Sequence, residues 1–270
     1  MDCSSALLDP ARPNPLRTTP IAVNILGQFE VRLVPPQILF DYGPKLQALI
    51  VSLAIRPKCS APRDVVLNSL WPDRDPELAS QSLNTLTSVL RRSLGPVIGG
   101  ASPICHENGY YRINVEAGIS LDVARFGELI RSGKEAHNNG DMVSAVTYYS
   151  AALEIYRGDL CSSHDPPSLL ERERLRALHL TVTAQIAEYH LGRADYRTAL
   201  DLGHRLLSYD PCREDAYRLV MRCYVRLGER AEAMRQFRLC EEVLLREFDA
   251  RPEAATVALF DLVRLDPGRA

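Results

Sequence analysis

LWPDRDPELASQSLNTLTSVLRRSLGP, residues 70–96, is the stretch that decides the fold, because its apolar and polar residues separate at helical spacing. Its leucines recur at steps of three and four residues, at Leu83, Leu86, Leu90 and Leu94. At about 100° per residue, these leucines form one narrow stripe, which predicts a helix packed on a core. The opposite side carries Gln81, Thr85, Ser88 and Arg92, with Asn84 beside them.

Two interpretations of that polar side compete. Most polar helix faces do nothing more than contact water. Side chains that donate and accept hydrogen bonds, followed by Arg91 and Arg92, can also reach base edges and phosphates in a DNA major groove. Evidence from the rest of the sequence is therefore needed to distinguish a solvated helix from a recognition helix.

The composition predicts two globular domains with little net charge. The chain has 270 residues, of which 46% are hydrophobic and 24% charged. Residues 21–116 hold nine Lys and Arg against eight Asp and Glu, and residues 117–270 hold twenty-one against twenty-four. Nucleic-acid binders normally show a basic footprint, so this balance argues against one. Binding to DNA would depend on locally placed arginines.

The cysteines and the start of the chain predict a cytoplasmic protein. The seven cysteines are scattered without a CxxC pair, which is typical of free thiols in a reducing compartment. Cys161 and His164 lack the second ligand pair of a structural zinc site, so we expect no metal. Residues 1–20 are proline-rich without an apolar core, which predicts a disordered lead rather than a signal peptide. We expect neither a membrane segment nor a cofactor.

The order of elements in residues 21–116 predicts a winged helix. Residues 21–26 and 29–33 alternate like a strand hairpin, and residues 38–40 add a possible third strand. Three helices are expected at residues 45–55, 62–71 and 77–94. Residues 105–107 and 110–115 flank Asn108-Gly109 and predict a second hairpin. Strands, three helices and a hairpin form a geometry that many regulators dock on DNA.

Residues 117–267 predict an all-α domain of helix pairs resembling tetratricopeptide repeats. A glycine, an alanine and an aromatic residue recur around Gly140, Gly192 and Gly228, and the spacing from Gly192 to Gly228 is close to the 34-residue period of those repeats. Glycine permits the turn between antiparallel helices, and alanine lets the helices approach closely. The fold class is thus mainly α with a small β component.

Several motifs, in order along both domains, resemble the Streptomyces antibiotic regulatory protein family. They are Ile25-Leu-Gly27, Leu70-Trp71-Pro72-Asp73, Ser82-Leu83-Asn84, Leu90-Arg91-Arg92-Ser93-Leu94-Gly95, Gly109-Tyr110-Tyr111, Tyr156-Arg-Gly158-Asp159-Leu160 and Glu171-Arg-Glu-Arg-Leu175. The resemblance implies an OmpR-like winged helix followed by a bacterial transcriptional activator domain. It also implies two copies bound to tandem promoter repeats, with Trp71, Asp73 and Asp75 in a loop that contacts RNA polymerase.

Particular residues are expected to contact double-stranded promoter DNA. For base edges we expect Gln81, Asn84, Thr85 and Ser88, whose side chains form hydrogen bonds there. For phosphates we expect Arg91, Arg92, Arg74 and Lys45. For the wing, the second hairpin, we expect His106, Asn108 and Arg112.

The sequence contains none of the common enzyme motifs. It has no GxxxxGK[ST], GxGxxG, GxSxG or HExxH pattern, so we expect no catalytic residues. The alternative function is a protein-interaction scaffold, in which a degenerate winged helix has lost DNA binding and the repeats hold partner proteins.

Overall fold

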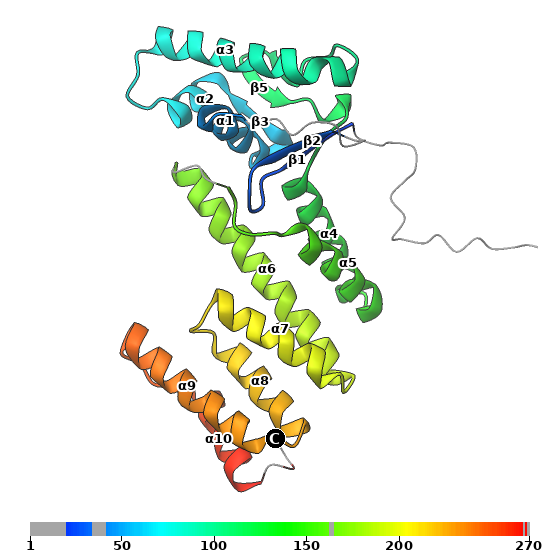
Figure 1. Ribbon diagram of the computed structural model, residues 1–270, viewed down its shortest axis with the longest axis vertical. Coiled ribbons are helices and arrows are strands. Elements are labelled where there is room, and N and C mark those ends of the chain that lie inside the picture. The colour runs from blue at the N-terminus through cyan, green and yellow to red at the C-terminus, as the bar shows by residue number, and fades with distance from the viewer. Residues whose placement is uncertain (1–19, 34–41, 162–164, 267, 269–270) are drawn as a thin grey trace, which may run out of the picture. The chain divides into compact units, whose positions relative to one another are not determined.

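The chain divides into two units in the computed structural model, which describes residues 20–33, 42–161, 165–266 and 268 (Figure 1). The first unit extends to Arg125 and also includes residues 158–171. The second unit contains residues 126–157 and the chain from Arg172 onward. Helices α4 and α6 each contribute to both units.

The first unit begins with a small mixed sheet in the order β2-β1-β6. Strands β1 (Ile21–Asn24) and β2 (Glu30–Leu33) pair antiparallel, which confirms the predicted hairpin. Strand β6 (Ile119–Leu121) pairs parallel with β1, a pairing that the sequence did not predict. The possible strand at residues 38–40 lies outside the described residues.

Three helices follow, as the pattern predicted: α1 (Pro44–Ala54), α2 (Arg63–Leu70) and α3 (Pro76–Leu94). Helix α3 begins after Asp75, whose carboxylate accepts hydrogen bonds from the backbone N–H groups of Glu77 and Leu78 at 2.9 and 3.1 Å. This side-chain cap satisfies two amides that have no partner inside the helix. A one-turn 3₁₀ helix, η2 (Gly95–Ile98), follows α3.

The wing is the antiparallel sheet β3-β5-β4. Strands β4 (Ile104–Glu107) and β5 (Tyr110–Ile113) form the predicted hairpin, and β3 (Ser60–Pro62) pairs with β5 on its other side. Asn108 and Gly109 have φ values of 52° and 78°, the left-handed pair that a tight two-residue turn requires. The short 3₁₀ helices η1 (Pro57–Cys59) and η3 (Val115–Ala117) flank this sheet in sequence.

A return segment closes the first unit. The N–H of Gly27 donates to the carbonyl of Asp159 at 2.9 Å, and the N–H of Cys161 donates to that of Ile25 at 2.8 Å. A Cβ on Gly158 would lie 3.2 Å from the Cα of Gly27, so the close approach favours glycine. Leu160 is buried beside these bonds. The Arg-Gly-Asp-Leu motif therefore serves this backbone pairing.

The second unit is built from antiparallel helix pairs. Its helices are α4 (Asp122–Asn138), α5 (Met142–Ile155), α6 (Pro166–Gly192), α7 (Tyr196–Tyr209), α8 (Glu214–Arg226), α9 (Arg230–Phe248) and α10 (Ala254–Leu265). Close approach is visible at Gly203, where a Cβ would lie 2.6 Å from a methyl group of Val220. No helix in the described part of the chain has the length and apolar character needed to cross a bilayer.

The turn between α6 and α7 differs from the predicted template. Gly140 and Gly228 have positive φ, as expected of turn glycines, but the left-handed residue of the middle turn is Ala194 (φ 61°) rather than Gly192. Ala194 precedes Gly228 by 34 residues, the repeat period itself. The sequence did not reveal this turn position, because alanine rarely adopts the left-handed conformation.

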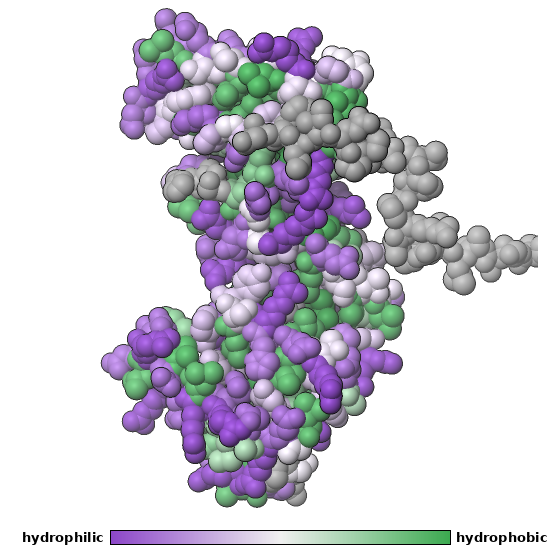
Figure 2. Space-filling model, in the orientation of Figure 1, coloured by the Kyte–Doolittle hydropathy of each residue, from purple (hydrophilic) through white to green (hydrophobic). Residues whose placement is uncertain are grey.

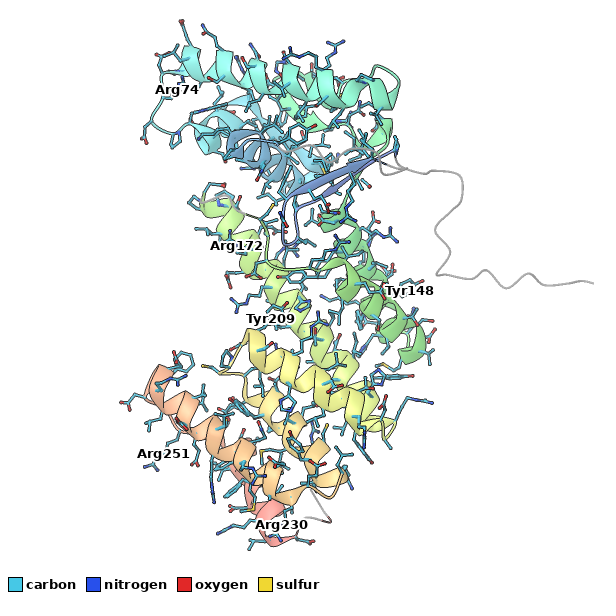
Figure 3. All side chains as sticks on the ribbon, in the orientation of Figure 1. Arg74, Tyr148, Arg172, Tyr209, Arg230 and Arg251 are labelled. Carbon is cyan, nitrogen blue, oxygen red and sulfur yellow. The ribbon has the colours of Figure 1, made fainter. Side chains whose placement is uncertain are left out.

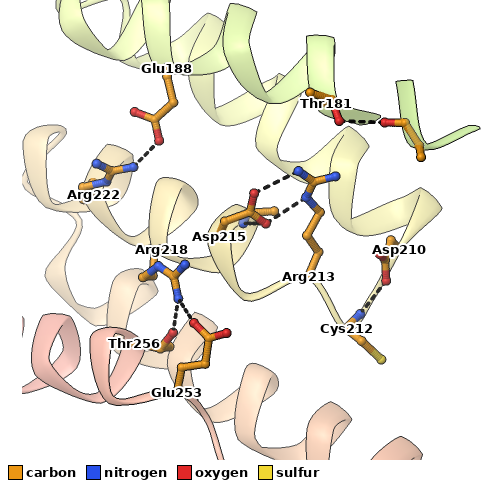
Figure 4. Close-up of polar contacts among 12 residues, drawn as sticks. Thr181, Glu188, Asp210, Cys212, Arg213, Asp215, Arg218, Arg222, Glu253 and Thr256 are labelled. Atoms are coloured by element: carbon orange, nitrogen blue, oxygen red, sulfur yellow. Dashed lines mark hydrogen bonds and ion pairs between the residues drawn. The ribbon is translucent and has the colours of Figure 1, made fainter. Parts of the chain in front are cut away.

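Polar contacts on α8 join its neighbours (Figure 4). Arg218 donates to Glu253 at 3.1 Å and to the hydroxyl of buried Thr256 at 2.8 Å, so α8 and α10 are tied where α10 begins. Arg222 pairs with Glu188 of α6.

The cysteines of the described residues are free thiols. Burial raises the pKa of Cys223 to about 11 and that of Cys240 to about 12, so both stay protonated at neutral pH. Within the described ranges, His, Cys, Asp and Glu residues form no group of three that could hold a metal, and His164 lies outside those ranges.

Candidate nucleic-acid interface

Helix α3 presents the predicted contact residues on one surface. Leu83, Leu90 and Leu94 are buried in the core of the first unit. The opposite side exposes Gln81, Asn84, Thr85, Ser88, Arg91 and Arg92. At 100° per residue these six fall within an arc of about 120°, whose centre lies about 140° around the helix from that of the buried leucines. We call them the α3 face. From Gln81 to Arg92 they extend over roughly 16 Å at 1.5 Å per residue.

Most of the hydrogen-bonding groups on the α3 face remain available. Among the described residues, the side chains of Gln81, Asn84 and Ser88 have no hydrogen-bond partner. The Thr85 hydroxyl donates to the carbonyl of Gln81 at 3.0 Å, which leaves its oxygen as an acceptor. Asparagine and glutamine side chains without other hydrogen-bond partners can form bidentate hydrogen bonds with adenine. The α3 face can therefore both donate to and accept from base edges.

Around α3, the positions of the charged residues matter more than the net charge of the unit. No acidic residue occurs between Glu77 and Glu107, and Arg91 and Arg92 lie within that interval. Neither arginine forms an ion pair with a described residue. They lie in the last turn of α3, where a cation also interacts favourably with the helix dipole. Together they place two unpaired positive charges at one end of the α3 face.

Arg74 lies beside the start of α3 (Figure 3). Its guanidinium donates to the hydroxyl of Ser82 at 3.2 Å, and its side chain is exposed. This contact brings the cation onto the flank of α3, close to Gln81. Arg74 at one end and Arg91 and Arg92 at the other thus border the uncharged part of the α3 face.

Lys45 has a contact that the sequence did not suggest. Its ammonium donates to the carbonyl of Leu70 at 2.5 Å and lies 5.8 Å from the centre of the Trp71 ring. The carbonyl is one of those left without a partner at the end of α2. Lys45 therefore joins α1 to the end of α2, and a phosphate would have to compete with that contact.

The wing residues do not share a surface. His106 stacks on Tyr111 at 4.4 Å between ring centroids, and Tyr111 is buried on the inner face of the sheet. Arg112, the next residue along β5, lies on the outer face and pairs with Glu116 at 3.2 Å. Asn108 lies in the exposed turn between the strands. Of the three predicted residues, His106 therefore lies on the inner face, Arg112 on the outer face and Asn108 in the turn between the strands.

Two further residues border the turn of the wing. Tyr110 is an aromatic side chain with 51% exposure, next to Gly109. Arg63 begins α2, and its N–H donates to the carbonyl of Gly109 at 2.9 Å. The alternation of Tyr110 with buried Tyr111 could have indicated the first from sequence. The second had no sequence signal, because it is brought to the wing by the pairing of β3 with β5.

The loop before α3 combines structural and exposed side chains. Trp71 is half-buried against Lys45, and the carboxylate of Asp75 is occupied by the cap of α3. Asp73 is exposed without a hydrogen bond to any described residue. The three residues predicted to contact a protein partner thus have different environments.

The far end of α3 is fixed to the loop before α1. The hydroxyls of Tyr42 and Ser93 are hydrogen-bonded at 2.8 Å, and burial raises the pKa of the Tyr42 phenol. The phenol therefore stays protonated across the physiological range. This bond holds the turn that carries Arg91 and Arg92 at a fixed orientation.

Comparisons with known proteins extend over both units. The family model described as the bacterial transcriptional activator domain matches residues 121–264. Regulatory protein AfsR of Streptomyces coelicolor is 25% identical over 230 residues, which cover 84% of this chain but only 23% of AfsR. Regulatory protein DnrI of Streptomyces peucetius is 25% identical over 227 residues, covering 80% of this chain and 82% of DnrI.

A third relative and one solved structure agree with these. Transcriptional regulatory protein MoaR1 of Mycobacterium tuberculosis is 24% identical over 247 residues, covering 89% of this chain and 78% of MoaR1. The structure of Mycobacterium tuberculosis EmbR in complex with a low affinity phosphopeptide matches 93% of this chain and 67% of EmbR, with a TM-score of 0.71 and 20% identity. The predicted fold class is confirmed.

Proposed function

The chain belongs to the family of the bacterial transcriptional activator domain, of the Streptomyces antibiotic regulatory protein type that its motifs indicated, and from this premise we propose that it is a sequence-specific DNA-binding transcriptional activator. Its relatives AfsR, DnrI and MoaR1 are regulatory proteins by name. In this proposal the protein acts in the cytoplasm by recruitment, without catalysing a reaction.

The α3 face is the observation that carries the proposal. A helix used only for packing needs its buried leucines, but it does not need an exposed arc of unpartnered amides, beside the hydroxyls of Thr85 and Ser88 and bordered by cations. In this mechanism Gln81, Asn84, Thr85 and Ser88 contact base edges, while Arg91, Arg92 and Arg74 contact phosphates. Lys45 and the wing residues His106, Asn108 and Arg112 contribute less, because contacts within the chain already engage Lys45, His106 and Arg112.

The proposed partners are those that the family resemblance implies. Two copies bind tandem repeats in a promoter, and the loop containing Trp71 and Asp73 contacts RNA polymerase. Asp75 supports that loop through its cap rather than by touching the polymerase, because its carboxylate already accepts two backbone hydrogen bonds.

An electrophoretic mobility shift across a salt series tests the proposal. The full chain is titrated onto promoter fragments from its own genomic neighbourhood, with random DNA as competitor. We expect selective binding, and we expect Arg92→Ala to reduce the slope of log K against log salt by roughly one unit, as loss of one phosphate contact requires. Arg238→Ala is the matched control, because Arg238 is exposed on α9 and has no ion pair with a described residue.

The scaffold alternative predicts a different result. If the winged helix has lost DNA binding, no fragment is bound selectively at low salt, and Arg92→Ala behaves like Arg238→Ala. The near-neutral charge of residues 21–116 is the observation that favours this alternative.

A further inference from the structure

The second unit contains an open groove of about 640 Å³ between α5, α6 and α7. Its walls include Leu153 and Glu154 of α5, Ile186 and His190 of α6, and Leu202 and Arg205 of α7. We call this cavity the α5–α7 groove. Its volume lies within the roughly 300–1,000 Å³ of typical small-molecule sites.

The floor of the groove is apolar, aromatic and held in place. Tyr156 and Ile186 are almost fully buried, and Tyr209 lies at the end of α7 (Figure 3). The Tyr156 ring stacks on the buried ring of His179 at 4.2 Å, and the Tyr209 ring meets the same ring edge-on at 5.1 Å. One buried imidazole thus fixes both tyrosines. A flat apolar ligand would find a preformed surface and would lose little free energy in ordering it.

One cation on the rim of the groove is available. Arg205 is exposed, and its guanidinium forms no hydrogen bond or ion pair with a described residue. His190 is engaged, because its Nδ1 is 2.9 Å from Asp195, the residue that caps α7. Glu154 contributes one carboxylate from the opposite wall, also without a partner in the described chain. Arg205 can therefore hold an anion, and Glu154 can accept a hydrogen bond.

From this arrangement we propose that the α5–α7 groove binds a small organic anion with an apolar, aromatic body. The body lies on the partly exposed Leu153, Leu202 and Tyr209, above the buried Tyr156 and Ile186, and the anionic group pairs with Arg205. A guanidinium supplies directed, charge-assisted hydrogen bonds to such a group. The ligand would touch three helices of the second unit at once. Its binding does not depend on the proposed DNA contacts, so the two proposals fail or succeed separately.

Fluorescence titration of the full chain with 1-anilinonaphthalene-8-sulfonate tests the site. This probe combines an aromatic body with one fixed negative charge. We expect one saturable site per chain, with the Kd raised about five- to tenfold in Arg205→Ala, as loss of a solvent-accessible charged hydrogen bond implies. Arg238→Ala removes the same charge from α9 and should leave the Kd unchanged. Equal Kd values in both variants would overturn the assignment.

A matched pair of competitors tests the charge. Indole-3-acetate should displace the probe, while the neutral indole-3-acetamide, of nearly the same shape, should displace it at least several-fold less well. Equal displacement by both compounds would refute the role of the anionic group.

A second variant tests the position of the site. Leu202→Glu places a negative charge on the α7 wall, where the side chain is only half-buried, so the fold should survive. Circular dichroism should be unchanged while probe binding is lost. Retained binding in a folded Leu202→Glu protein would place the probe elsewhere, for example on the exposed Leu245 and Phe248 of α9, and would contradict the proposal.

Discussion

Helices α3 and α9 are both 19 residues long, and each packs one side on a core and exposes the other. Their exposed sides differ in how the charged residues are paired. On α9, Arg235 pairs with Glu232 and Arg246 with Glu247. On α3, the exposed arc is uncharged until Arg91 and Arg92, which have no acidic partner in the described chain. Length and amphipathicity are therefore shared by the two helices, and the difference lies in the charges: α9 mixes arginines with glutamates, whereas the exposed arc of α3 has no carboxylate.

The surfaces of the two helices reflect the same difference. Figure 2 shows hydrophilic side chains over α9, interrupted by apolar ones, and Leu245 and Phe248 are 60% and 65% exposed. The α3 face contains no large apolar side chain, although Leu78 is exposed one turn before it. A surface with paired charges is stable in water without a partner, while unpartnered amides and cations favour a polyanion with hydrogen-bonding groups.

Charge reversal should have the largest effect on this comparison. Arg91→Glu combined with Arg92→Glu should weaken binding to promoter DNA by roughly 100-fold or more near 0.1 M salt, because two phosphate contacts become repulsive. The measurement is the Kd from mobility shifts. Arg238→Glu with Arg251→Glu is the control, because both arginines are exposed in the second unit. A similar loss in both pairs would mean that net charge, rather than the α3 face, governs binding.

Loss of one amide should have a smaller and more selective effect. Asn84→Ala should reduce discrimination at one base pair by about 1–3 kcal/mol, because the side chain has no other partner in the described chain. Binding to operators changed at single positions measures this. Ser80→Ala is the control on the flank of α3, where the hydroxyl already donates to the carbonyl of Pro76 at 2.6 Å. A uniform loss on all operators would contradict base recognition by Asn84.

Alanine substitutions of the two aspartates in the loop before α3 should differ in their effect on the stability of the first unit. Asp75→Ala should lower the free energy of unfolding of the first unit by about 1 kcal/mol, because it removes the cap of α3. Asp73→Ala should change it by less than about 0.5 kcal/mol, as an exposed residue without such a role. Trp71 is the single tryptophan and lies in the first unit, so its fluorescence in urea reports this unit. Equal losses would argue against the cap.

The smallest expected effect concerns the turn between α6 and α7. Ala194→Gly should raise the free energy of unfolding by about 0.5–1 kcal/mol, because glycine relieves the strain of φ 61°. Thermal unfolding followed by circular dichroism measures the change. Gly192→Ala should not destabilise, since a Cβ there meets no atom within 4 Å. Destabilisation by Ala194→Gly would show that the turn is not strained.

Much of the candidate site was predictable because its signal is local. The steps of three and four residues from Leu83 through Leu86 and Leu90 to Leu94 indicated which side of α3 is buried, although Leu86 is only half-buried. Gln81 and Asn84 were exposed as expected. The hairpin around Asn108-Gly109 followed from the turn preference of that pair. The contact of Lys45 was missed because it depends on where α2 ends in space, and the cap by Asp75 was missed because the helix was expected to begin at Glu77 rather than at Pro76.

The sequence by itself determined the order of elements, the buried stripe of α3 and the helix pairs of the second unit, since each depends on residues a few positions apart. Only the tertiary structure decided which face of the wing carries His106 and which carries Arg112, because that depends on the inner face of a sheet. The parallel pairing of β1 with β6 and the formation of the open α5–α7 groove were likewise decided by tertiary structure. Such contacts join residues far apart in the chain, and short strands and single side chains carry no periodic pattern that reveals their partners.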